Sequence, residues 1–334
     1  MSIQSVKRRR LFRVIVGIFG LVLLCTSAAF AQEKIKIGII NQIDILPFFD
    51  TIDGVKKGLA EKGFGEDKVE YILFSVKGNI DSIKDGIDQM RKAHNLKLIA
   101  SIGTRATIET LKYVQDIPVV YSCVSYAESI NEAGKQLGFA NNYTGTLLNA
   151  PAEKVIDLAL KIKSRKEIGR IGMIYCSKED NARRDKDNFE EGCRKFGIES
   201  IVIAYIEESE IIGAFQKLVD QGIRCILFPK DTLINKHLDE LKPIIFQNQI
   251  FTLAADTAFV QKGGAVLAFS APAYKVGMLA GDRIAQILNG KKPADIPPEG
   301  LKSFEIWINM AVASKTKIDI PSTVVKIASK VITE

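Results

Sequence analysis

Histidine is almost absent from the sequence, and no catalytic motif surrounds the two that occur. His94 and His237 lie beside no Ser or Cys in a nucleophile motif, and their spacing suits no zinc site among the 334 residues. The sequence also lacks a GxxxxGK[ST] loop, and no GxGxxG follows a predicted strand. We therefore expect no metal site, no cofactor and no catalytic residues.

Long apolar runs are also missing, apart from one near the start of the chain. Residues 11–24 are apolar except for Arg13, follow a cationic start and precede Ala29-Phe30-Ala31, which offers small residues for an export peptidase. This run is shorter than the ~20 residues that a membrane span needs. We expect a signal peptide over residues 1–31, cleaved before Gln32; an uncleaved anchor and twin-arginine export are the alternatives.

The excess of positive charge comes partly from this leader. Five of the 46 Lys and Arg residues and none of the 39 acidic residues lie within it, so the net charge falls from +7 to +2 after cleavage. So small a charge gives no support to a nucleic-acid partner.

Cysteine is scarce and matches no CxxC or metal-binding spacing. Four cysteines follow the leader: Cys123, Cys176, Cys193 and Cys225. The predicted strands place Cys176 and Cys225 at opposite ends of a sheet, beyond bonding range, whereas Cys193 could approach Cys225. Buried free thiols are the expectation, with a Cys193–Cys225 disulfide as the alternative.

Strand and helix patterns alternate along the rest of the chain. Strands are predicted at residues 34–41, 69–74, 96–102 and 119–122, and again at 169–176, 201–205, 225–228 and 250–254, with helical segments between them. Residues 126–137 are polar and are expected to be irregular. Helical crossovers of this length imply parallel sheets covered on both faces.

About 300 mature residues suit two such lobes. The predicted fold is therefore α/β, with two doubly wound parallel-sheet lobes and a ligand cleft between them. Lobe 1 is expected to comprise residues 32–143 plus about 271–300, and lobe 2 residues 144–270 plus about 301–334.

Polar side chains follow the predicted strands, at the edge where open parallel sheets bind ligands. The candidates are Gln42, Thr104, Ser122 and Ser125 in the first half, and Tyr175, Asp231 and Asp256 in the second. Thr104, Asp231 and Asp256 have a second interpretation as helix caps. The case for a site depends on several such positions coinciding.

Several segments together resemble a known family. They include Ile102-Gly103-Thr104, Asn142-Tyr143-Thr144-Gly145, Pro229-Lys230-Asp231, Ala255-Asp256 and residues 287–297, in an order that spans nearly all of residues 34–325. The chain resembles the ABC-transporter substrate-binding proteins of the tryptophan/tyrosine-binding type, which have the type I periplasmic-binding fold. The resemblance adds Asn142 and Thr144 to the ligand site, beside Thr104, Asp231 and Asp256. It fails at residues 122–126, where relatives carry Asp-Pro after the fourth strand.

The resemblance implies a periplasmic receptor that closes two lobes on a small solute and presents it to an ABC permease in the inner membrane. We expect a monomer that binds a small polar or zwitterionic, amino-acid-like ligand. The N-terminus of the helix at Thr104 would hold a carboxylate, and Asp231 or Asp256 an amine. Tyr121, Tyr126, Tyr175 or Phe228 would cover an apolar part. Strands near Asn142 and Phe269 would act as the hinge.

Two other functions remain open at the level of sequence. The first is a periplasmic sensory protein whose closed form binds a receptor or kinase instead of a permease. The second is an exported enzyme that uses Asp231 and Asp256 as an acid/base pair, although no other catalytic group accompanies them.

Overall fold

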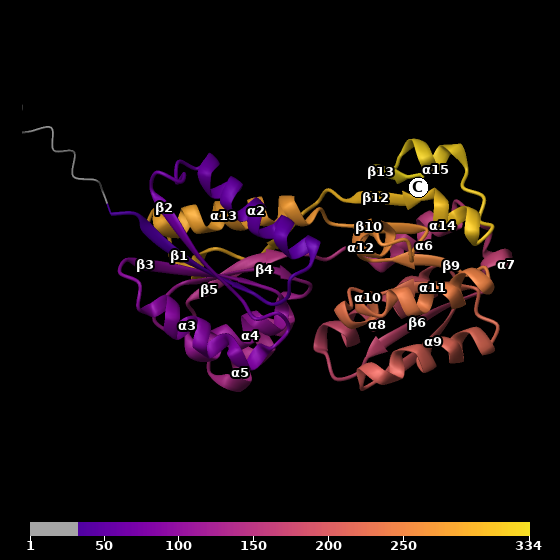
Figure 1. Ribbon diagram of the computed structural model, residues 1–334, viewed down its shortest axis with the longest axis horizontal. Helices are drawn as coiled ribbons and strands as arrows, with labels where there is room; N and C mark the ends of the chain where they lie inside the picture. Colours follow the sequence, from indigo (N-terminus) through magenta and orange to yellow (C-terminus); the bar gives the residue numbers. More distant parts are fainter. Residues whose placement is uncertain (1–32) are drawn as a thin grey trace, which may run out of the picture. The chain divides into compact units, whose positions relative to one another are not determined.

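The structure is a computed structural model that describes residues 33–334. The predicted signal peptide, residues 1–31, lies outside the described residues. Two sheets organise the described chain, one of six strands and one of seven (Figure 1). The prediction of an α/β fold with two doubly wound, mainly parallel sheets is confirmed.

The first sheet has the strand order β11-β5-β4-β3-β1-β2, and all its paired strands are parallel. Its strands are β1 (Ile35–Asn41), β2 (Val69–Ser75), β3 (Leu96–Ile102), β4 (Val119–Val124), β5 (Tyr143–Leu147) and β11 (Glu299–Gly300). Strand β5 continues to Leu147 in this sheet, whereas the predicted lobe boundary fell at residue 143.

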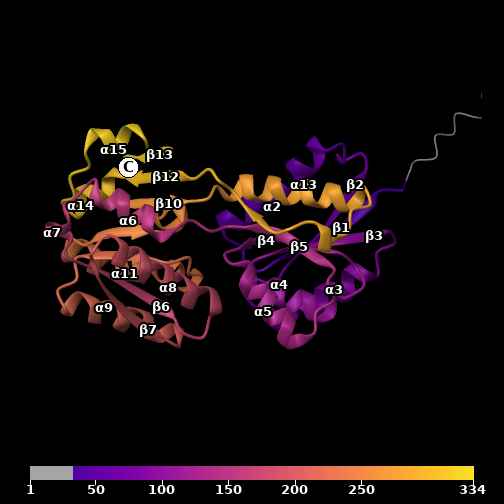
Figure 2. The same ribbon diagram turned by 180° about the vertical axis from the view of Figure 1, so that it is seen from behind.

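Helices cover both faces of the first sheet, so its strands β1, β3 and β4 are buried over most of their length. On one face lie α2 (Leu46–Glu61) and α13 (Ala273–Leu288), and on the other α3 (Ile83–Arg91), α4 (Thr104–Tyr113) and α5 (Ala127–Leu137), as Figures 1 and 2 show. Helix α13 follows a strand of the second sheet yet packs on the first sheet.

Glycines allow α2 and α13 to pack closely. A Cβ added at Gly54 of α2 would lie 2.0 Å from the carbonyl oxygen of Tyr274, and one at Gly277 of α13 would lie 2.1 Å from that of Thr51. Any larger side chain would separate the helices. These glycines therefore fix the position of the segment that returns from the second sheet.

The second sheet has the order β13-β12-β10-β9-β8-β6-β7, and only the β10–β12 pair is antiparallel. Its strands are β6 (Arg170–Cys176), β7 (Glu199–Tyr205), β8 (Cys225–Phe228), β9 (Phe251–Ala254), β10 (Leu267–Ser270), β12 (Glu305–Asn309) and β13 (Lys330–Ile332).

Two apolar clusters, one on each face, hold the helices of the second sheet. The first includes residues of α6 (Ala152–Leu160), α7 (Arg165–Ile168), α8 (Asp180–Lys195), α14 (Met310–Lys315) and α15 (Ser322–Lys326). The second includes residues of α9 (Ile211–Asp220), α10 (Thr232–Lys236), α11 (Leu238–Gln247) and α12 (Thr257–Gln261). Short 3-10 turns are η1 (Ile80–Ser82), η2 (Glu208–Glu210) and η3 (Pro293–Asp295).

The expectation of an irregular segment at residues 126–137 was wrong. This segment forms α5, which ends at Gly138 in the left-handed conformation. Only Ser129, Ile130 and Gly134 of its residues are buried, so Ile130 is the one large apolar side chain that marks its buried face, and the segment as a whole is polar. Among residues 33–334, no helix combines the length and hydrophobicity needed to cross a bilayer.

Candidate ligand-binding site

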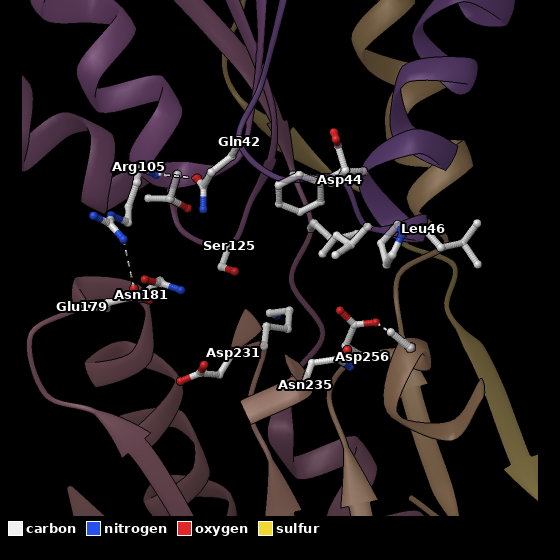
Figure 3. Close-up of a pocket in the computed structure, with 18 of the residues that line it drawn as sticks. Gln42, Asp44, Leu46, Arg105, Ser125, Glu179, Asn181, Asp231, Asn235 and Asp256 are labelled. Carbon is white, nitrogen blue, oxygen red and sulfur yellow. Dashed lines mark hydrogen bonds and ion pairs between the residues drawn. The ribbon is translucent and has the colours of Figure 1, made fainter. Parts of the chain in front are cut away.

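A cavity of about 340 Å³ lies where carboxyl ends of strands from both sheets meet (Figure 3). Its first-sheet lining follows β1, β3, β4 and β5, and its second-sheet lining follows β6, β8 and β9. The polar and charged lining residues are Gln42, Asp44, Thr104, Arg105, Ser125, Glu179, Asn181, Lys230, Asp231, Asn235, Asp256, Gln261 and Lys262. The volume suits one small molecule.

Gln42 caps the helix that was expected to hold a ligand carboxylate. Its side-chain Oε1 accepts hydrogen bonds from the backbone N–H groups of Arg105 (3.1 Å) and Ala106 (3.2 Å). Gly103 precedes the helix at φ 105°, and a Cβ there would lie 2.5 Å from this same oxygen. Two of the N–H groups at the start of α4 that have no acceptor within the helix are thus already hydrogen-bonded inside the protein. Thr104 lines the cavity beside them.

An ion pair joins the two walls of the cavity. The Nη1 atom of Arg105, at the start of α4, lies 3.7 Å from Oε1 of Glu179, which follows β6 (Figure 3). Burial raises the pKa of Glu179, and the positive charge of Arg105 opposes this rise. The pair lies at the rim, because 56% of the Arg105 side chain is exposed.

Asp231 is bound within the protein through both of its carboxylate oxygens. Oδ1 accepts from the N–H groups of Leu233 (2.9 Å) and Ile234 (3.1 Å), which makes Asp231 the N-cap of α10. Oδ2 accepts a hydrogen bond of 2.5 Å from the Tyr205 hydroxyl. Burial raises the pKa of Asp231 despite these bonds. The capping interpretation accounts for this residue, although it also lines the cavity.

Asp256 keeps more of its carboxylate for a ligand. Its Oδ1 caps α12 by accepting a hydrogen bond of 2.8 Å from the N–H of Ala258, and no other hydrogen bond or ion pair to its side chain occurs among the described residues. Burial raises its pKa, opposed by the Ala258 bond and by the charges of Lys230 and Lys262. An ammonium group beside Asp256 would further stabilise the ionised carboxylate.

The apolar part of the lining comes mainly from the start of α2. Ile45, Leu46, Pro47 and Phe48 lie here, together with Leu148 beyond β5. The expectation of an aromatic cover was wrong for the residues proposed, since none of Tyr121, Tyr126, Tyr175 and Phe228 is part of the lining. Tyr121 and Phe228 are fully buried, the latter stacked on Phe215 and Phe259.

Five of the nine predicted site residues meet at the cavity: Gln42, Thr104, Ser125, Asp231 and Asp256. The structure does not bring the other four there: Ser122, Asn142, Thr144 and Tyr175. Ser122 is buried within β4, where its hydroxyl lies 2.8 Å from that of Thr146. Tyr175 packs against the core of the second sheet.

Asn142 and Thr144 lie at the opposite end of the first sheet from the cavity. They stand at the beginning of β5, whereas the cavity is at the carboxyl ends of these strands. The carbonyl oxygen of Asn142 accepts from the N–H of Val119, and the buried Thr144 hydroxyl donates to the carbonyl of Ile296 at 2.5 Å. The Asn-x-Thr-Gly segment is therefore bonded to β4 and to the segment before β11, and not to the cavity.

Several lining residues escaped the sequence analysis. Glu179 and Asn181 come three and five residues after the end of β6 at Cys176, within reach of the same strand-end rule. Asn235, Gln261 and Lys262 could not be found this way, because they lie within or beyond short helices that follow their strands.

The four cysteines of the described part are buried and free of disulfides, as expected. Cys123 adopts φ 54°, and its sulfur lies 2.9 Å from the Thr51 hydroxyl at the cavity wall. Burial raises the pKa of Cys123 to about 12, so the thiol is protonated at neutral pH.

Within residues 33–334, no group of three or more His, Cys, Asp or Glu side chains is arranged to hold a metal ion.

Residues 36–332 match the family model described as ABC transporter substrate binding protein. A tyrosine-binding protein of Clostridioides difficile (strain R20291) is 24% identical over 285 residues, which are 84% of this chain and 80% of that protein. Both are similarities of sequence that extend over most of the chain.

Solved structures share the fold. An ABC domain from Streptococcus pneumonia in complex with L-Trp superposes with a TM-score of 0.78 and 24% identity, covering 90% of this chain and 100% of that one. The ligand-free, open structure of a substrate-binding protein with adhesive properties from Clostridium difficile gives a TM-score of 0.69 and 23% identity, covering 90% and 99%.

Proposed function

The chain belongs to the ABC transporter substrate-binding protein family, and from this premise we propose that it is the exported receptor of an ABC importer. The resemblance seen in the sequence is thereby confirmed, and the family is defined by solute binding, not by catalysis. The receptor would work in the periplasm, as a monomer, and would deliver its solute to a permease of the inner membrane.

The observation that carries this proposal is the cavity of about 340 Å³, which draws its lining from both sheets. A ligand held there touches both walls at once, so it stabilises the arrangement in which the two lobes contact each other. The chain passes between the sheets after β5, after β10 and after β11, in residues 148–151, 271–272 and 301–304. These three segments would form the hinge.

The ligand would be small and amino-acid-like. Asp256 offers a carboxylate oxygen to an ammonium group, and the hydroxyls of Thr104 and Ser125 offer hydrogen bonds. Leu46, Phe48 and Leu148 would cover an apolar side chain. The tyrosine-binding relative and the complex with L-Trp support this ligand class.

Native mass spectrometry of the protein from Gln32 onward tests the proposal. Denaturation of the sample releases any bound compound, and a thermal-shift panel of amino acids runs beside it. A ligand at 100 times its dissociation constant stabilises the folded state by about 2.7 kcal/mol, which a thermal shift detects. A bound amino-acid-like mass that also raises the melting temperature is the expected result. A protein that carries no small molecule and responds to no compound would contradict the proposal.

A further inference from the structure

Three cationic side chains line the cavity, and the described residues satisfy only two of them. Arg105 pairs with Glu179 at 3.7 Å, and the ammonium of Lys262 donates to Oδ1 of Asn235 at 2.5 Å. The ammonium of Lys230 makes no hydrogen bond or ion pair with any residue from 33 to 334. Lys230 is partly exposed at the cavity, so its ammonium is available to form a charge-assisted hydrogen bond with a bound anion.

The backbone around Lys230 is held in place from both sides. Its N–H donates to Oδ2 of Asp185 at 3.2 Å, and Asp185 is only 7% exposed. The following residue, Asp231, caps α10, and the preceding residue is Pro229, which has a restricted φ. The base of the lysine side chain is therefore fixed, while its ammonium stays free to meet a ligand.

The charge of Lys230 acts at both walls of the cavity. Burial raises the pKa of Asp256, in the second-sheet wall, and that of Cys123, in the first-sheet wall, and the charge of Lys230 opposes both rises. The alternative anion site, the N-terminus of α4, is capped by Gln42 at two N–H groups. A cationic and an anionic side chain thus stand close together in the lining, as an α-amino acid would require.

We infer that Lys230 binds the acidic group of the ligand, a carboxylate, and restricts the receptor to anionic or zwitterionic solutes. This assignment rests on the proposed receptor function and names its ligand class. The interaction is a charge-assisted hydrogen bond from an ammonium whose backbone is already ordered, which lowers the entropy cost of binding.

The test compares each L-amino acid with its own α-carboxamide, for example L-tyrosine with L-tyrosinamide, by thermal shift and then by calorimetry. The wild-type protein should bind the acid about 10- to 100-fold more tightly than the amide. Lys230→Met should remove most of this preference, and Lys230→Gln should do so with a polar side chain retained. Lys217→Met, on the exposed surface of α9 and outside the cavity lining, is the matched control, and its acid-to-amide ratio should equal that of the wild type.

Equal binding of acid and amide by the wild type would overturn the inference. If no amino acid binds, native mass spectrometry of the wild type and of Lys230→Met decides. If the wild type carries an acidic compound that Lys230→Met lacks, the result supports the role of Lys230 in binding the acidic group. It then corrects only the proposal that the ligand is an amino acid. A neutral or cationic compound retained by the variant overturns the role of Lys230 and leaves the receptor proposal standing. A wild type without any bound compound overturns both.

Discussion

The hydroxyl of Tyr126 donates a hydrogen bond of 2.5 Å to Oδ1 of Asp185, and so joins the segment after β4 of the first sheet to helix α8 of the second. The other oxygen of Asp185 accepts from the N–H of Lys230 in the cavity wall. Ser129 Oγ donates to Asp180 at 2.5 Å, and Arg184 pairs with Glu132 at 2.7 Å, across the same junction. Contact between the lobes is thus directly connected to a ligand-lining loop.

Tyr126→Phe should weaken ligand binding while leaving the fold intact. The substitution leaves an oxygen of the buried Asp185 without a donor, at a cost of about 1–3 kcal/mol, and only in the arrangement where the lobes touch. We expect about a tenfold loss of affinity by calorimetry with the compound found by mass spectrometry. Tyr113→Phe, on the exposed surface of α4, is the control. Unchanged affinity of Tyr126→Phe would show that this bond does not stabilise the bound state.

Asp231→Ala should reduce stability more than a surface substitution does. The change removes the cap of α10 and the acceptor for the Tyr205 hydroxyl, so the free energy of unfolding should fall by about 2 kcal/mol. The assignment of Asp231 to the ligand's amine, made from the sequence, would instead predict a loss of affinity in a protein that stays folded. Urea unfolding measures the effect, with Asp239→Ala in the exposed first turn of α11 as a control that changes stability little. An Asp231→Ala protein that keeps its stability but binds the ligand more weakly would show instead that Asp231 binds the ligand's amine.

Asp256→Asn should isolate the charge of this side chain from its capping role. Asparagine caps helices as well as aspartate does, so α12 should persist. Loss of the negative charge should lower the affinity for an ammonium-bearing ligand about tenfold or more. Unaltered affinity in calorimetry would remove Asp256 from the site.

The same carboxylate predicts how binding depends on pH. Burial holds the pKa of Asp256 above its ordinary value in the empty protein, and an ammonium group binds only the ionised form well. Affinity should therefore be full above this raised pKa and should fall as the pH is lowered through it. Titration of the wild type beside Asp256→Asn checks the assignment, because the variant should show a flatter profile over the same range.

His237 should make stability depend on pH on the alkaline side. The carboxylates of Glu208 (2.7 Å) and Glu240 (2.6 Å) raise its pKa in the folded state. This contribution is complete below the ordinary His pKa of about 6.5 and is lost as the pH rises through the raised value. Urea unfolding at a series of pH values measures this effect. The free energy of unfolding should change less with pH for His237→Gln than for the wild type. His94→Gln, at a position without an ion pair among the described residues, should behave like the wild type.

The thiols should remain unreactive until the protein unfolds. Burial raises the pKa of Cys123 and of Cys193 to about 12, and raises those of Cys176 and Cys225 as well. Thiolate is the reactive form, so a thiol reagent should label the mature native protein slowly and the denatured protein at four positions. Dithiothreitol should leave the melting temperature unchanged. A drop in that temperature would indicate a disulfide, with Cys193 and Cys225 as the first candidates.

The fold could be read from the sequence because it depends on local patterns. Apolar runs such as residues 96–102, followed by a glycine and a helical spacing, specify a buried strand and the helix after it. A repeated order of such units allows few arrangements besides parallel sheets covered on both faces. Helix α5 was missed because its sequence is mostly polar and buries only one large apolar side chain, that of Ile130.

The strand-end rule found Gln42, Thr104, Ser125, Asp231 and Asp256, because the carboxyl ends of parallel strands share one edge. It failed for Ser122, which is still within β4, where side chains alternate between the two faces of the sheet. It also could not reveal which groups were already bonded, since capping by Gln42 and by Asp231 depends on the backbone around each side chain.

The sequence by itself determined the order of strands and helices, the parallel character of the sheets and most of the edge that carries the cavity. Only the tertiary structure decided that Arg105 meets Glu179, that Lys262 meets Asn235 and that the ammonium of Lys230 has no partner in the described chain. The physical reason is that secondary structure follows from neighbours in sequence, whereas the availability of a charge follows from partners that distant segments bring within a few ångströms.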